Sequence, residues 1–141
     1  AAHRSENITI VFVNNAIYGM TGGQMSPTTL LGQKTTTSPD GRTASQGLPL
    51  RIAEMMATIP GATYIERVSV HNPQHVNKAK KALKKAFTIQ KENKGFTLIE
   101  FISTCPVNWG MTPKDAIDWA VDNMITYYPL GVFKDATEGE K

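Results

Sequence analysis

The sequence predicts one α/β domain with a parallel, doubly wound sheet and helices on both faces. Three observations lead to this fold class. Strand patterns alternate with helix patterns along the chain, the strands are continuous apolar runs, and 141 residues suit a single domain. Strands buried on both faces have this apolar character, and alternating β and α segments form parallel sheets.

Three segments have the character of buried strands: residues 8–13 (ITIVFV), 63–68 and 96–102. Three strands make a thin sheet, and each of them needs neighbours on both edges. Residues 1–7 are typical of the last turn of a helix. We therefore expect residues 1–141 to be the carboxyl-terminal part of one larger domain, incomplete at its amino end.

The helices are marked by caps, prolines and apolar stripes. Residues 49–58 form a short helix that Pro60 and Gly61 end. Asn72 is an N-cap with proline after it, so a helix runs over 73–91. Its apolar stripe comprises Val76, Ala79, Leu83, Ala86 and Phe87. Thr112 caps the last helix, and residues 134–141 are expected to be a mobile polar tail.

Composition excludes several classes of protein. Fifteen basic and twelve acidic residues give a net charge of +3, too small to indicate nucleic-acid binding. No apolar run approaches the ~18 residues of a membrane span. A single cysteine excludes an intramolecular disulfide framework and favours a reducing, cytoplasmic location.

Residues 19–47 form a long loop rich in Gly, Pro, Ser and Thr. Loops of this length inside a domain are usually functional, and a disordered linker is the alternative. At the start of the loop, the Asn15 amide oxygen and the Ile17 carbonyl can face one point, as neutral ligands of Mg²⁺ or Ca²⁺. Gly19 and the glycines after it allow backbone N–H groups to cradle a phosphate. A glycine-rich turn without a ligand is the other interpretation.

Cys105 lies at the end of the third predicted strand, in the motif Ser-Thr-Cys-Pro. Ligands of open parallel sheets bind outside the carboxyl ends of the strands, so the position is suited to chemistry. A lone cysteine is equally often a small buried hydrophobe.

Four segments resemble the thiamine-diphosphate-binding β subunit of 2-oxoacid:ferredoxin oxidoreductases: ITIVFVNNAIYGMTGGQMSPTT, KTTTSPDGR, FTLIEFISTCPVNWGMTP and MITYYPLGVFKD. The resemblance is nearest to subunits acting on 2-oxoglutarate or branched 2-oxoacids. It implies the thiamine-diphosphate-binding fold. It also implies that Asn15 and Ile17 bind Mg²⁺ and that Gly19, Met20 and Thr21 line the cofactor. The Gly-Asp-Gly half of the family's motif is absent from this chain, so we expect an incomplete site.

The same resemblance implies that Cys105 is one of four thiolates that hold a [4Fe–4S] cluster, the other three lying outside this chain. The implied reaction is oxidative decarboxylation of a 2-oxoacid to an acyl-CoA, with coenzyme A as acceptor and electrons passing to ferredoxin. The implied partners are an alpha subunit, with gamma and delta subunits as further candidates. No residue of this chain is assigned a catalytic role, and the isolated chain is expected to be inactive.

Two other classes of function stay open. The chain could be a non-catalytic interaction piece that binds no cofactor alone. It could also belong to a thiamine-dependent decarboxylase without ferredoxin, although Cys105 and the cluster it implies argue against this.

Several further residues have a structural and a functional interpretation. Glu100, within an apolar strand, is interpreted as structural. His71 and His75 have zinc-ligand spacing, but the helix starts between them, which disfavours zinc. The lysines at 78, 80, 81, 84 and 85 are interpreted as a solvated face, or else as a docking site for acidic ferredoxin. Trp109 and Trp119 are expected in the core or a subunit interface.

Overall fold

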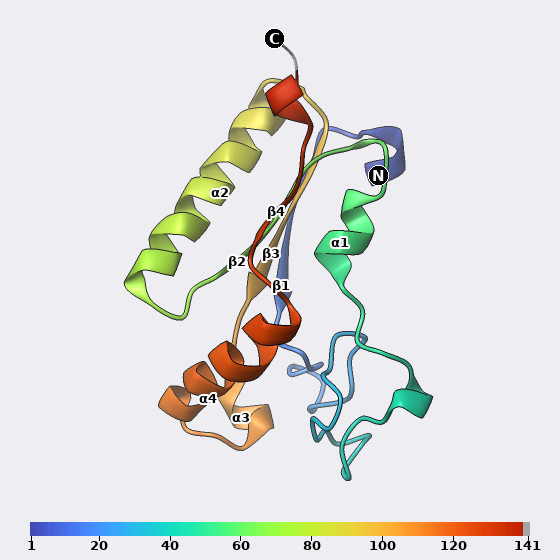
Figure 1. The fold of residues 1–141 in the computed structure, drawn as a ribbon, viewed down its shortest axis with the longest axis vertical. Helices are drawn as coiled ribbons and strands as arrows, with labels where there is room; N and C mark the ends of the chain where they lie inside the picture. The colour runs from blue at the N-terminus through green and yellow to red at the C-terminus, as the bar shows by residue number, and fades with distance from the viewer. Residues whose placement is uncertain (140–141) are drawn as a thin grey trace. The chain divides into compact units, whose positions relative to one another are not determined.

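The computed structural model describes residues 1–139, and their contacts form two compact units (Figure 1). The first unit comprises Ala1–Val13, Ile52–Phe101 and Pro129–Lys141. The second comprises Asn14–Arg51 and Ile102–Tyr128. Each unit is described by itself below. None of the helices in the described part of the chain is long and apolar enough to cross a membrane.

The first unit is built on a four-stranded sheet in the order β1-β3-β2-β4. The strands are β1 (Thr9–Asn14), β2 (Ala62–Ser69), β3 (Phe96–Ile102) and β4 (Gly131–Asp135). Thr97 N donates to Ile8 O at 3.0 Å and Ser103 N donates to Asn14 O at 2.9 Å, so β1 and β3 run parallel. The Thr63 hydroxyl donates to Lys94 O at 2.8 Å, which places the starts of β2 and β3 together.

Helices cover both faces of this sheet, as the sequence predicts (Figure 1). On one face, α2 (Pro73–Lys91) packs against Tyr64, Val68 and Ile99. On the other, α1 (Ile52–Ala57) belongs to a second cluster that contains Ile65. The buried residues of α2 are Ala79, Ala82, Ala86 and Ile89. The predicted bounds of α2 are confirmed, but Phe87 is 54% exposed and lies outside the buried stripe.

The local signals at the helix starts are confirmed. The Asn72 side chain accepts from His75 N at 2.9 Å, with Pro73 in the first turn of α2. Thr112 Oγ1 accepts from Asp115 N at 3.2 Å at the start of α4 (Pro113–Trp119). These bonds satisfy N–H groups that a helix start leaves without partners.

The fourth strand, which the sequence did not predict, adds an antiparallel pair to the predicted parallel sheet. β4 pairs with β2 in antiparallel orientation, with Tyr64 opposite Asp135. The polar tail expected from residue 134 therefore begins in a strand. Ala136–Gly139 form the 3-10 helix η4, and residues 140–141 lie outside the described residues. A five-residue segment that starts at a glycine has too weak a pattern to show strand pairing.

β1 departs from the prediction that it is buried on both faces. Within the described residues it is an edge strand, and Val11 and Val13 are 46% and 57% exposed. Before it, the expected helical turn is the 3-10 helix η1 (Ala2–Arg4). The apolar sequence of β1 is that of an inner strand, and the described residues leave much of it uncovered.

The second unit consists of the long loop and the helices that follow β3. The loop includes one 3-10 turn, η2 (Ala44–Gln46). The helices are α3 (Pro106–Trp109), which the sequence analysis missed, α4, and the π-helical turn η3 (Ala120–Ile125). Trp109 and Trp119 are half-buried, with ring centroids 4.7 Å apart, so they pack against each other within this unit.

Candidate functional site

The turn after β1 is held in a strained conformation. Ala16 is fully buried with φ of 55°, a left-handed conformation that costs a non-glycine residue roughly 1–2 kcal/mol. Its N–H donates to Asn14 Oδ1 at 3.0 Å, and Ile17 N donates to Asn15 Oδ1 at 3.3 Å. Such conformations persist where the surroundings enforce them, and they cluster at functional sites.

Thr29 enforces this turn from within the long loop. Its fully buried hydroxyl donates to Ala16 O at 2.7 Å and accepts from Ser26 N at 2.9 Å. The Thr29 hydroxyl therefore satisfies two backbone groups, the carbonyl of Ala16 thirteen residues earlier and the N–H of Ser26 three residues earlier. The threonine-rich composition of the loop does not distinguish this threonine from its neighbours.

The turn contains the two neutral oxygens that the sequence predicts as metal ligands, the Asn15 amide oxygen and the Ile17 carbonyl. The half-buried Asn15 amide oxygen has a second lone pair, and no described residue donates a hydrogen bond to the Ile17 carbonyl. Hard oxygen donors of this kind suit Mg²⁺. They carry no charge, and the described residues contain no group of three or more His, Cys, Asp or Glu that could hold a metal. The turn therefore fits part of a Mg²⁺ site.

The predicted cofactor-lining residues lie in a tight turn that follows. Tyr18 N donates to Gln24 O at 3.0 Å, and Gly23, with φ of 80°, donates back to Tyr18 O at 2.9 Å. Thr21 Oγ1 donates to Gln24 Oε1 at 2.7 Å, and the Met20 side chain is fully exposed. Met20 and Thr21 thus occupy the exposed tip of the turn.

Gly19 is packed against Cys105. The segment that follows β1 thus lies beside the segment that follows β3. A Cβ on Gly19 would lie 2.9 Å from Cys105 Sγ and 3.8 Å from Asn15 Nδ2. The half-buried Cys105 also accepts a hydrogen bond from Asn108 Nδ2 at 3.2 Å. Sequence reasoning missed Asn108, although its position three residues after the cysteine puts both on one helical face.

Buried Arg42 organises the long loop. Only 6% exposed, it donates to backbone carbonyls of two other loop segments. These acceptors are Thr29 O at 2.7 Å, Pro27 O at 2.9 Å, Gly47 O at 3.0 Å, Ser26 O at 3.2 Å and Leu48 O at 3.3 Å. A buried arginine without hydrogen bonds would be costly, so the cage of carbonyls holds it and the loop together. The loop therefore has a defined, hydrogen-bonded structure and is not a disordered linker.

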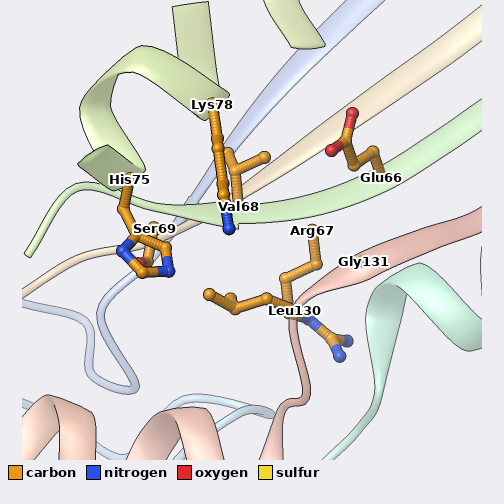
Figure 2. A pocket seen from close by; sticks show the side chains of 8 residues that line it. All are labelled: Glu66, Arg67, Val68, Ser69, His75, Lys78, Leu130 and Gly131. Carbon is orange, nitrogen blue, oxygen red and sulfur yellow. The ribbon is translucent and has the colours of Figure 1, made fainter. Parts of the chain in front are cut away.

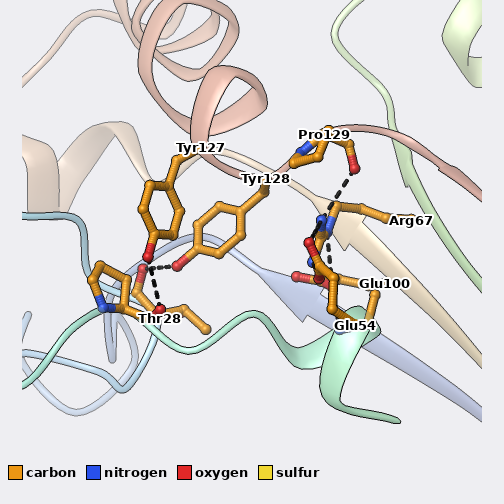
Figure 3. Close-up of polar contacts among 9 residues, drawn as sticks. Thr28, Glu54, Arg67, Glu100, Tyr127, Tyr128 and Pro129 are labelled. Carbon is orange, nitrogen blue, oxygen red and sulfur yellow. Dashed lines mark hydrogen bonds and ion pairs between the residues drawn. The ribbon is translucent and has the colours of Figure 1, made fainter. Parts of the chain in front are cut away.

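Two tyrosines after η3 bind the same loop (Figure 3). Buried Tyr128 donates through its hydroxyl to Thr28 O at 2.7 Å. The neighbouring Tyr127 hydroxyl donates to Pro49 O at 3.0 Å. Tyr128 thus attaches the helical segment of the second unit to Thr28, beside Thr29, and Tyr127 attaches it to the end of the connection before α1.

Glu100, in the first unit, is part of a buried ion-pair network (Figure 3). Its Oε2 accepts from Arg67 Nε at 2.9 Å, and both side chains are fully buried. Arg67 also pairs with Glu54 and donates to Pro129 O at 3.0 Å. The arrangement agrees with the structural interpretation of Glu100.

A hollow of about 140 Å³ lies beside the carboxyl end of β2 (Figure 2). His75 and Lys78 line it from α2, and Glu66 and Ser69 line it from β2. Burial raises the pKa of the Glu66 carboxyl, and the hydrogen bond from Tyr64 opposes this only in part.

The two histidines predicted to have zinc-ligand spacing lie against each other. The ring centroids of His71 and His75 are 4.1 Å apart, and His71 Nδ1 lies 2.6 Å from Ser69 Oγ. Burial lowers the pKa of His71, and the charge of His75 lowers it further. No third metal-binding side chain joins the pair among the described residues.

The lysines of α2 line a second, open hollow of about 500 Å³. Lys81, Lys84 and Lys85 contribute from α2, and Lys94 follows the helix. Lys85 pairs with Asp135. Burial would raise the pKa of the Asp135 carboxyl, but hydrogen bonds from Lys85 and Thr137 outweigh it and lower the pKa. The hollow is predominantly basic.

Comparison with known proteins bears on this site. Residues 1–101 match the family model described as "Thiamine pyrophosphate enzyme, C-terminal TPP binding domain". Ketoisovalerate oxidoreductase subunit VorA of Methanothermobacter marburgensis is 41% identical over 136 residues, which are 96% of this chain and 28% of that protein. The 2-oxoglutarate synthase subunit KorB of Methanocaldococcus jannaschii is 38% identical over 143 residues, covering 97% and 47%.

The fold resembles a solved structure of 2-oxoglutarate:ferredoxin oxidoreductase from Magnetococcus marinus, with a TM-score of 0.71 and 24% identity. That structure has 2-oxoglutarate, coenzyme A and succinyl-CoA bound, and the match covers 95% of this chain and 49% of that one. The chain thus spans less than half the length of each of these proteins.

Proposed function

Because this chain belongs to the thiamine pyrophosphate enzyme family, as a C-terminal TPP-binding domain, we propose that it supplies part of the Mg²⁺–thiamine diphosphate site of a 2-oxoacid oxidoreductase. The proposed reaction converts a 2-oxoacid to an acyl-CoA and passes electrons to ferredoxin. The names of the VorA and KorB relatives support this reaction class. They also support assembly with other subunits of the same enzyme.

The observation that carries the proposal is the strained turn at Ala16. Asn15 and Ile17 would hold the divalent ion through two neutral oxygens, with charged ligands coming from outside this chain. Thiamine diphosphate, when bound, supplies the nucleophilic carbon for decarboxylation. Thr29 and Arg42 keep the turn and the long loop in place, and the ordered loop would exclude water from the reacting groups.

The residues of this chain do not suffice for an iron–sulfur cluster. Cys105 is the one cysteine in the sequence, and a [4Fe–4S] cluster is held by four thiolates. Cys105 stays a predicted ligand whose companions would come from outside this chain. Its contact with Gly19 places a sulfur beside the proposed cofactor loop.

The test of the function is Asn15→Ala in the intact enzyme. Loss of one Mg²⁺ ligand should raise the dissociation constants of Mg²⁺ and thiamine diphosphate together, by about tenfold or more, as measured by calorimetric titration. Asn77→Ala removes an exposed amide from α2 and is the matched control. Unchanged cofactor titration in Asn15→Ala would refute the assignment.

A further inference from the structure

We infer that Asn108 is a positioning residue that couples the cofactor loop to the sulfur of Cys105. The inference rests on the proposed function and concerns how the same site is held. Asn108 Nδ2 donates to Gly19 O at 3.2 Å and to Cys105 Sγ at 3.2 Å. Both protons of one amide group are thus engaged, one on the loop and one on the sulfur.

Two glycines of the loop leave space for the Asn108 amide group. A Cβ on Gly23 would lie 2.9 Å from Asn108 Oδ1, and a Cβ on Gly19 would lie 3.2 Å from Asn108 Nδ2. Gly19 has no left-handed φ, so a close approach rather than backbone conformation explains the missing side chain there. The loop therefore leaves room for the Asn108 carboxamide at both ends of the Tyr18–Gln24 turn.

Local structure holds the donor beside the sulfur. Pro106 starts α3, and Trp109 N donates to Cys105 O at 3.0 Å, which closes one helical turn over the cysteine. Asn108 lies within that turn, three residues after Cys105, so its side chain can return to the sulfur. The loop and the thiol are therefore linked through one short helix.

One side chain carries both halves of this link. The Asn108 amide donates to the loop carbonyl and to the sulfur, so loss of either acceptor leaves the side chain less firmly held. Removing the Cys105 sulfur should therefore weaken the hold of Asn108 on Gly19. Gly19 lies four residues after Asn15 in the proposed cofactor loop. Cofactor affinity should therefore depend on Asn108 and Cys105 jointly.

A double-mutant cycle in the intact enzyme tests the coupling. The dissociation constant of thiamine diphosphate at saturating Mg²⁺ is measured by calorimetry for the wild type, Asn108→Ala, Cys105→Ala and the double variant. Asn108→Ala should weaken binding by about tenfold in the wild type and by less than about threefold in Cys105→Ala, because hydrogen bonds of one network are not additive. Asn108→Ser, which keeps one donor, should give an intermediate constant.

Asn123→Ala is the matched control, since that amide donates to Trp119 O at 2.9 Å within its own helical segment. It should leave the constant unchanged. Additive effects of Asn108→Ala and Cys105→Ala, or less than a twofold effect of Asn108→Ala, would overturn the coupling while leaving the proposed function in place. Wild-type enzyme that binds no thiamine diphosphate would overturn the proposed function, and the coupling with it.

Discussion

At the scale of single residues, three buried polar side chains hold together segments that lie far apart in the sequence. Thr29, Arg42 and Arg67 are each at least nine-tenths buried, and each satisfies backbone or carboxylate groups far away in the sequence. A buried group of this kind is costly when its partner is removed, because water cannot replace the lost bond.

Thr29→Val should destabilise the turn at Ala16. Valine has nearly the same shape but leaves Ala16 O and Ser26 N without their hydrogen bonds, at about 1–3 kcal/mol for a buried group. We expect lower thermal stability of the intact subunit and weaker thiamine diphosphate binding, measured by melting and titration. Thr29→Ser keeps the hydroxyl and should retain most of both. Equal behaviour of the two variants would contradict a role for the hydroxyl.

Arg67→Met should destabilise the first unit strongly. The substitution leaves Glu100 buried without its cation, and breaking a buried ion pair costs about 3–5 kcal/mol. Denaturant unfolding of the intact subunit measures the change. Combining Arg67→Met with Glu100→Leu removes the stranded charge and should recover part of the loss. If the double variant is no more stable than Arg67→Met alone, the ion-pair explanation fails.

At the scale of elements, the start of α2 combines an ordinary cap with an unusual pair of imidazoles. Asn72 caps the helix and also lies 2.9 Å from His75 Nδ1, while His71 lies against His75. The connection between β2 and α2 thus packs two titratable rings where the helix N-terminus already disfavours positive charge. Its stability should respond to pH.

The lowered pKa of His71 sets the sign of that response. The folded protein takes up this proton at lower pH than the unfolded chain, whose value is near 6.5. Below about pH 6.5 the unfolded state binds more protons than the folded state does. The free energy of unfolding therefore decreases as the pH is lowered, until the pH is below the folded-state pKa of His71. His71→Gln should lose less stability than wild type between pH 7.5 and 5.5 in denaturant titrations. His3→Gln, at an exposed histidine, should follow the wild type.

At the scale of the whole molecule, the small net charge of +3 conceals an uneven distribution. Lysines gather on α2, where several of them line the basic hollow together with Lys94. A solvated face explains most of them. The hollow also has the charge that an acidic partner protein would need, and ferredoxin is the partner that the proposed reaction requires.

Lys81→Gln combined with Lys84→Gln tests that docking surface. If ferredoxin binds there, its reduction should slow by several-fold at low salt and return toward the wild-type rate at high salt, because exposed charges are screened. Decarboxylation with an artificial acceptor should not change. Arg4→Gln with Lys114→Gln removes the same charge elsewhere. Ferredoxin reduction at the wild-type rate in the Lys81, Lys84 variant would exclude this surface.

Elements with local signals could be predicted from the sequence, and so could the turn that carries part of the proposed site. The helix over 73–91, its Asn72 cap and the strand over 96–102 match the structure because caps and apolar periodicity act within a few residues. The turn at Asn15 was recognisable because it ends an apolar strand and precedes glycines. The mixed sheet was not, since β4 is too short to carry a pattern.

The sequence by itself determined the α/β class, the main helix and strands, and the position of the turn after β1, because these depend on neighbours along the chain. Only the tertiary structure decided which distant groups satisfy one another. Arg67 finds Glu100, Thr29 finds Ala16, and Asn108 joins Gly19 to Cys105. Hydrogen bonds between distant segments depend on where the folded backbone places their atoms. Periodic patterns in the sequence do not indicate which of these groups will meet.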